Sequence, residues 1–290
     1  MKDFIWKRFL LRLLSALITT WIVFFVSLSL LYVSRLLHPS CALSSEDVPG
    51  FESITLQTHD KLRLTGWWLP PKNGIVILLL GGHGSNRDTM LPDADLLIRH
   101  GYGIMTLDYR HCTGRISTLG YREIYELEAM LNFSRTQPGV EKIGVLGFSV
   151  GGAVALMGAA QFPEIEVVIA EGNYANLYDE ITAVPTTFFS VEWQLQQLIT
   201  IGYWLRTGIN PERVSPISDI PGISPRPILF IHGEHEINRS RGRDQYEAAG
   251  ANAQLWVVLD TGHGGYLQNH PKLYEQTIIH FLDESFEDDS

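Results

Sequence analysis

One serine in this sequence lies in the setting that nucleophilic catalysis requires. Ser149 is the centre of Gly147-Phe148-Ser149-Val150-Gly151, which matches the pattern Gly-x-Ser-x-Gly. The pentapeptide alone is a weak signal, but it follows the apolar run 143–146 and leads into the small-residue stretch 152–157, which indicates a strand followed by a helix. So sharp a turn needs small flanking residues and raises the hydroxyl above the sheet, near the positive end of the helix. We therefore predict that Ser149 is a nucleophile; the alternative is a structural turn with an incidental serine.

A serine nucleophile needs a base, and the base needs a carboxylate that orients it. His263 is the best candidate among the ten histidines, because it lies in a glycine-rich loop directly after the last apolar run of the chain. The carboxylate is predicted to be Glu236, in the loop beyond the apolar run 228–231, which gives the order nucleophile, acid, base. Glu234 and Glu171 are the alternatives for the acid.

Two backbone amides are expected to bind the negative oxygen that forms when the serine attacks. One is the amide of Val150, and the other is the amide of His83, in a loop whose glycines let the backbone approach a substrate. The His83 side chain is expected to face the pocket rim without a role. A metal held by His232, His235 and Glu236 is disfavoured, because their spacing is not that of a helical HExxH site. The predicted reaction needs neither a metal nor an organic cofactor.

The elements that must position these residues alternate along the chain. Residues 54–58 and 62–68 alternate in polarity and predict an antiparallel hairpin. Short continuous apolar runs follow, as in strands buried on both faces of a parallel sheet, at residues 75–80, 104–107, 143–146, 167–170, 228–231 and 255–259. A helical stretch at 121–137 lies between two of them, which predicts an α/β sheet covered on both sides. The apolar insertion 173–216 should lie over the carboxyl ends of the strands as a lid.

The amino terminus differs from the rest of the chain. Residues 13–34 carry no charge and are long enough to cross a bilayer. Lys2, Lys7, Arg8 and Arg12 precede them and Arg35 alone follows closely, so we expect residues 1–12 to be a cytoplasmic tail and the globular part to lie outside. The alternative is a cleaved signal peptide, which should have a shorter apolar core and a small-x-small cleavage site. Residues 35–50 are expected to link this anchor to a single domain at 51–286.

Composition limits the functions that this chain can have. It has 290 residues and a net charge of −10, which argues against nucleic acid as a partner because phosphate binding needs a basic face. Its two cysteines, Cys41 and Cys112, lie far apart and form no CxxC pattern, so the sequence predicts neither a disulfide framework nor a zinc cluster.

With these residues placed, the globular part resembles the α/β-hydrolase superfamily, and within it the serine-aminopeptidase-like and Bem46-like single-domain hydrolases. The resemblance rests on the pentapeptide around Ser149 and on residues 210–217, which lead into the apolar segment 227–233. It implies the α/β-hydrolase fold: a mostly parallel central sheet, helices on both faces and a helical lid.

The same resemblance bears on two site residues. Glu236 takes the place where the family usually has aspartate, which favours it over Glu234. Where family members usually have His-Gly, this chain has Gly81-Gly82, which aligns His83 with the residue whose amide completes the oxyanion hole.

The sequence thus predicts a membrane-anchored serine hydrolase that cleaves an ester or an amide through an acyl-enzyme. The expected substrate is a small-molecule or lipid-like ester. An aminopeptidase is one alternative, in which Glu171 or Asp179 would hold a free amine. A non-catalytic binding domain of the same fold is the other.

Overall fold

The computed structural model describes residues 2–42, 44–184, 186–188 and 190–287. Residue 1 of the predicted tail, residue 43 of the predicted linker and residues 185 and 189 of the predicted lid lie outside the described part.

The described residues form an eight-stranded sheet in the order β1-β2-β4-β3-β5-β6-β7-β8. The first two strands form the predicted hairpin, β2 also pairs antiparallel with β4, and the remaining neighbours are parallel. The mostly parallel sheet predicted from the apolar runs is therefore confirmed. The strands are β1 (Glu52–Gln57), β2 (Arg63–Leu69), β3 (Ile75–Leu80), β4 (Gly103–Leu107), β5 (Lys142–Phe148), β6 (Val167–Glu171), β7 (Ile228–Gly233) and β8 (Ala253–Val258).

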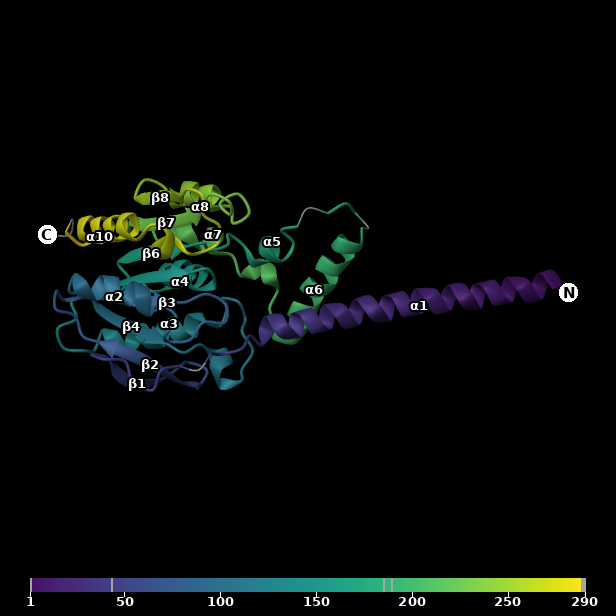
Figure 1. The fold of residues 1–290 in the computed structure, drawn as a ribbon, viewed down its shortest axis with the longest axis horizontal. Helices are drawn as coiled ribbons and strands as arrows, with labels where there is room; N and C mark the ends of the chain where they lie inside the picture. The colour runs from purple at the N-terminus through teal and green to yellow at the C-terminus, as the bar shows by residue number, and fades with distance from the viewer. Residues whose placement is uncertain (1, 43, 185, 189, 288–290) are drawn as a thin grey trace.

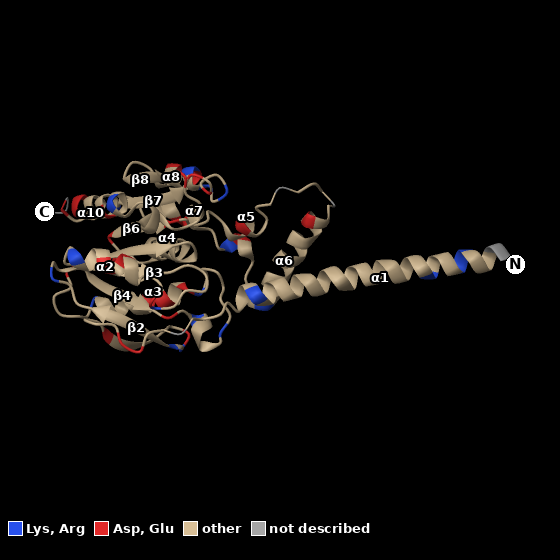
Figure 2. Cartoon of the chain, in the orientation of Figure 1, with Lys and Arg blue, Asp and Glu red and all other residues tan. Residues whose placement is uncertain are grey.

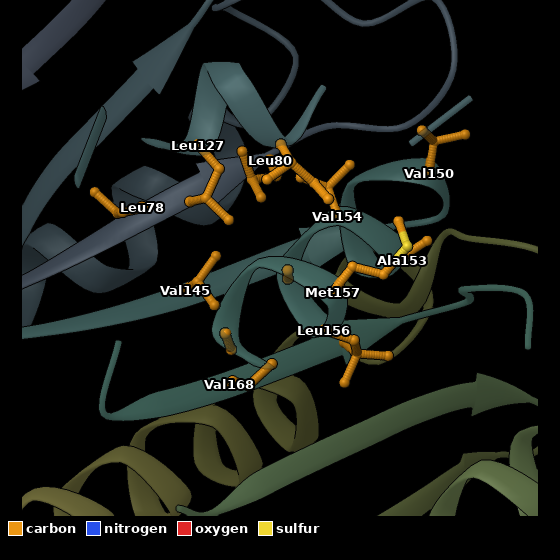
Figure 3. Close-up of a cluster of buried hydrophobic side chains, with 14 of the residues drawn as sticks. Leu78, Leu80, Leu127, Val145, Val150, Ala153, Val154, Leu156, Met157 and Val168 are labelled. Carbon is orange, nitrogen blue, oxygen red and sulfur yellow. The ribbon is translucent and has the colours of Figure 1, made fainter. Parts of the chain in front are cut away.

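Alternate side chains of each strand point to opposite faces of the sheet, and each face has its own apolar core. Leu78 and Leu80 of β3 pack near α3 (Ile124–Ser134) and α4 (Val150–Gln161) on one face (Figure 3), and the same cluster extends to α8 (Gly242–Ala249). Ile77 and Leu79 pack on the other face with α2 (Leu91–Arg99), α9 (Tyr266–Asn269) and α10 (Pro271–Glu287). Helices thus cover both faces (Figure 1), as a sheet of continuous apolar strands requires.

The insertion between β6 and β7 is helical, as predicted for the lid. It contains α5 (Leu177–Ile181), α6 (Val191–Thr207) and the short 3-10 helix η2 (Pro211–Arg213), and it ends in α7 (Pro216–Asp219) and η3 (Ile220–Gly222). α6 leaves the globular body and lies against the end of the amino-terminal helix (Figure 1).

The amino-terminal helix, α1 (Lys2–Leu37), projects from the body as a rod (Figure 1). It contains the predicted anchor 13–34, and its stretch Phe4–Leu37 has a mean hydropathy of 2.2, so α1 is long and apolar enough to cross a bilayer.

The spacing of the two cysteines indicates no disulfide framework, but the structure contains one disulfide. Cys41 and Cys112 are bonded to each other at an S–S distance of 2.03 Å. Cys112 lies in the 3-10 helix η1 (Arg110–Thr113) after β4, and the segment that follows α1 passes this loop. The pairing depends on the path of the chain over 71 residues, which no local spacing pattern reveals.

Candidate active site

Ser149 occupies a strained turn between β5 and α4. Its φ is 56° and its ψ is −116°, a conformation that few residues other than glycine adopt. A Cβ atom at Gly147 would lie 2.2 Å from the carbonyl oxygen of Gly151, and one at Gly151 would lie 2.2 Å from that of Leu80. The glycines of the pentapeptide are therefore required by close backbone contacts on both sides of the serine.

The structure places the predicted base and acid in line with this serine. His263 Nε2 lies 3.1 Å from Ser149 Oγ, and His263 Nδ1 lies 2.5 Å from Glu236 Oε2. The Phe148 ring packs against the imidazole with 5.0 Å between ring centroids, and Gly264 keeps the loop clear of that ring at a φ of +87°. Serine, histidine and glutamate thus form one hydrogen-bonded chain, which is the geometry of an activated nucleophile.

Glu236 is held by two further groups. The Gly233 amide donates to its Oε1 at 3.0 Å, and the Tyr266 hydroxyl donates to the same oxygen. Burial alone would raise the pKa of this carboxyl, but the hydrogen bonds from His263, Tyr266 and Gly233 outweigh it and lower the pKa below its usual value. Glu236 therefore faces His263 as a carboxylate. Tyr266 could not be predicted from the sequence, because nothing in the residues around it indicates that its hydroxyl contacts Glu236.

Both alternative carboxylates have other partners. Glu234 Oε2 accepts the Asp260 amide at 3.1 Å. Glu171 is fully buried, and its Oε1 lies 2.6 Å from the Tyr274 hydroxyl, which also lies 2.7 Å from Asp93 Oδ1. Burial, together with the charge of Asp93, raises the pKa of Glu171 well above its usual value. The position beside His263 belongs to Glu236 alone among these three glutamates.

The two predicted amide donors lie next to the serine. Val150 is the first residue of α4, so its amide is one of the four at a helix start that have no partner within the helix. The loop before His83 passes close to Ser149, because a Cβ atom at Gly82 would lie 3.2 Å from Ser149 Cβ. His83, Ser149 and Val150 all line one cavity.

The expectation that the His83 side chain has no role is wrong. It does lie at the rim, but its Nε2 lies 2.7 Å from the carbonyl oxygen of Leu36, in the last turn of α1. Carbonyl groups in the last turn of a helix have no partner within the helix, so an imidazole N–H satisfies one of them. The same residue thus connects the predicted oxyanion loop to α1.

The cavity above Ser149 has a volume of about 560 Å³, which suits a small ligand or an acyl chain. Its wall includes residues of α1 and of the lid: Tyr32, Leu36, Tyr174, Leu177, Glu180, Ile181 and Val184. Glu180 is paired with Arg239, another wall residue, at 2.5 Å. Residues 174–184 of the predicted lid therefore line the cavity above Ser149, whereas α6 lies against α1.

The residues considered for other functions have partners elsewhere. His232 is buried with its Nδ1 3.1 Å from Ser240 Oγ, and burial lowers its pKa to about 4. Asp179, considered as an amine-binding group, is paired with Arg241 at 2.8 Å. The cluster of possible metal ligands among the described residues is at Cys41, His111 and Cys112, where the two sulfurs are joined to each other.

Known structures share this fold. The esterase Pf2001 of Pyrococcus furiosus matches with a TM-score of 0.71 and 23% identity over 86% of this chain and 98% of that chain. The α/β-hydrolase GrgF from Penicillium sp. sh18 matches with a TM-score of 0.63 and 18% identity over 82% and 99%. The acylaminoacyl peptidase of Pyrococcus horikoshii matches with a TM-score of 0.61 and 16% identity over 82% of this chain and 42% of that chain. No protein-family model and no curated protein sequence matches this chain.

The chain therefore has the α/β-hydrolase fold, with one long apolar helix added at its amino terminus. Identities below a quarter of the aligned residues establish the fold and leave the reaction to be argued from the site.

Proposed function

We propose that this protein is a membrane-anchored serine hydrolase that cleaves an ester through an acyl-enzyme on Ser149. The observation that carries the proposal is the unbroken chain from Ser149 Oγ through His263 to Glu236, at 3.1 Å and 2.5 Å. The glycine-flanked turn that presents the serine beside a cavity supports the same reaction.

In the proposed reaction, His263 takes the proton of Ser149 while the serine oxygen bonds to the ester carbonyl carbon. The amides of Val150 and His83 bind the resulting oxyanion. The carbon–oxygen bond to the alcohol then breaks, and the alcohol leaves with the proton from His263. Water, deprotonated by the same imidazole, attacks the acyl carbon and releases the acid and the free serine. Glu236 stabilises the protonated His263 both while the acyl-enzyme forms and while water hydrolyses it.

An ester is favoured over a peptide with a free amino terminus. Such a peptide would need an uncompensated carboxylate in the cavity to hold its amine. Of the two candidates for that role, Glu171 is buried behind Tyr274 and Asp179 is paired with Arg241. The wall carboxylate Glu180 is itself paired with Arg239.

Substrate screening tests this preference. We expect acyl esters to be hydrolysed at least about a hundredfold faster, in kcat/KM, than aminoacyl amides of similar size, since a site without an amine-binding charge gains little from the amine. Faster cleavage of the amides would establish the aminopeptidase alternative. Loss of both activities in folded protein would establish a binding domain.

The proposed topology places residues 1–12 in the cytoplasm, residues 13–34 across the membrane, and residues 51–286 outside as the hydrolase domain. It is supported by the basic residues before the apolar segment and by the Cys41–Cys112 bond, because disulfides persist in oxidising compartments. Protease added to intact cells should digest the hydrolase domain. Complete protection of this domain would show that it lies on the cytoplasmic side instead.

A further inference from the structure

The end of the anchor helix is part of the globular body. Val33 and Leu37 of α1 are both 0% exposed, and the Leu37 carbonyl accepts the Ser117 amide at 2.8 Å. Gly202 of α6 lies against Val33, where a Cβ atom would come within 3.0 Å of a valine methyl. The lid helix therefore packs on a residue that belongs to the charge-free segment 13–34.

The cavity extends to the same segment. Its wall contains Tyr32, which lies within 13–34, and Leu36, one turn further along α1. Ile181 and Val184 of the lid line the wall with them. A molecule that reaches Ser149 past these residues moves along the outer end of the apolar segment.

The surface of the lid beyond the cavity is apolar and exposed. Phe188 is 71% exposed, Leu205 is 69% exposed and Trp204 is 53% exposed, and Val191 and Ile201 are also exposed. We call these five residues the apolar lid face. Glu192 is the single charged residue from 181 to 205, and Figure 2 shows α6 as uncharged over most of its length, like the adjoining α1.

The position of the apolar lid face indicates what it contacts. A patch of large apolar side chains in water is unfavourable and marks a contact surface. Because α6 packs on α1 at Val33, a bilayer crossed by residues 13–34 reaches the lid without any further partner. Trp204 lies two residues after Gly202, where a tryptophan suits the membrane–water boundary. Because α6 carries the charge of Glu192 near its start, we expect it to insert only to the boundary between headgroups and acyl chains, about 5–10 Å deep, and not to cross the bilayer as a second span.

We propose that the apolar lid face inserts into the leaflet next to the hydrolase domain, and that the cavity takes its substrate, a membrane-resident acyl ester, from that leaflet. The acyl chain would enter between α1 and the lid, past Tyr32 and Val184, and bring its carbonyl to Ser149. The substrate part of this inference rests on the proposed hydrolase function. The insertion of the lid does not.

Site-specific fluorescence tests the insertion without reference to activity. Cys41 and Cys112 are bonded to each other, so a single added cysteine can be labelled selectively. Full-length Leu205→Cys and Phe188→Cys, labelled with an environment-sensitive nitrobenzoxadiazole dye in phosphatidylcholine vesicles, should shift to the blue and be quenched by spin-labelled lipid. Leu273→Cys, on α10 and 49% exposed, is the matched control and should do neither. Equal, unquenched emission from all three positions, or emission that changes only with protein concentration as in self-association, overturns the proposal.

Two substrates test whether the acyl ester enters the cavity from the leaflet. In vesicles, the double variant Phe188→Ser/Leu205→Ser should hydrolyse a long-chain acyl lipid at least about fivefold more slowly than the parent, because weaker insertion lowers access to the leaflet. Both proteins should hydrolyse a soluble short-chain ester equally, and Leu273→Ser should change neither rate. A parent protein that cleaves the soluble ester but not the bilayer lipid overturns this inference and leaves the proposed function standing. A parent protein inactive on both overturns both.

Discussion

Replacing Glu236 by glutamine tests which carboxylate orients His263, the proposed base. Glutamine keeps the size of the side chain and removes its charge. The amide can also turn its NH2 toward His263 Nδ1, which would force the proton onto Nε2, the nitrogen that must accept the proton of Ser149. The variant should therefore fold normally and lose most of its rate.

The expected loss can be worked from the geometry. Two unit charges separated by the 2.5 Å between His263 Nδ1 and Glu236 Oε2 interact by about 6.6 kcal/mol at an effective dielectric constant of about 20. The His263 side chain is 52% exposed, so water screens part of this energy. If about 4–5 kcal/mol remains in the transition state, kcat should fall by about 10³–10⁴.

The assay is hydrolysis of a soluble nitrophenyl ester by full-length protein in detergent micelles, with folding checked by circular dichroism. Glu171→Gln is the matched control, because it removes a carboxylate that lies behind Tyr274 and does not contact His263. We expect its kcat to stay within about threefold of the parent value, since changes outside the reacting groups have small effects on the rate. A Glu236→Gln variant that keeps more than a tenth of the parent rate would refute the reasoning, as would a large loss in Glu171→Gln instead.

Three further changes have defined outcomes. Tyr266→Phe removes a hydrogen bond to a charged group, which is worth about 1.5–3 kcal/mol. We therefore expect kcat in the ester assay to fall about tenfold or more and the pKa of the Glu236 carboxyl to rise. An unchanged kcat would show that Tyr266 does not help to position Glu236. Glu171→Gln should flatten the pH dependence of stability: burial raises the pKa of Glu171 well above the usual 4.5, so the folded protein keeps a proton that the unfolded chain releases, and stability falls as pH rises through this range. In thermal melts between about pH 5 and pH 8, the free energy of unfolding of the variant relative to the parent should increase by up to about 1.4 kcal/mol per pH unit. Stability curves that run parallel for the two proteins over this range would contradict the raised pKa of Glu171. Cys41→Ser opens the loop closed by the bond to Cys112, with a separation of 71 residues, and should cost up to about 4 kcal/mol by loop entropy; a melting temperature equal to that of the parent would show that the bond does not constrain the unfolded chain.

Local sequence patterns were enough to predict the sheet and the turn at the nucleophile. Strands buried on both faces give continuous apolar runs, and the run 75–80 predicts the bounds of β3 without error. The turn at Ser149 is equally local, because the contacts that exclude side chains at Gly147 and Gly151 lie within the strand–helix junction and the neighbouring strand.

Contacts between distant segments could not be predicted in the same way. The hydroxyl of Tyr266 reaches Glu236 because α9 and the loop after β7 end at the same edge of the sheet, and neither segment alone shows this. The link between His83 and Leu36 requires that the last turn of α1 lie beside the loop after β3. A charge-free helix in the sequence predicts a membrane span and says nothing about what its last turn will contact.

Covalent labelling measures whether Ser149 is an activated nucleophile. Full-length folded protein should react with a fluorophosphonate probe and gain the mass of one phosphonyl group, located on Ser149 by peptide mass spectrometry. Ser149→Ala should not react, and His263→Ala should react at least about a hundredfold more slowly, because the serine would lose its base. Folded parent protein that does not react, or Ser149→Ala that still does, would contradict the account.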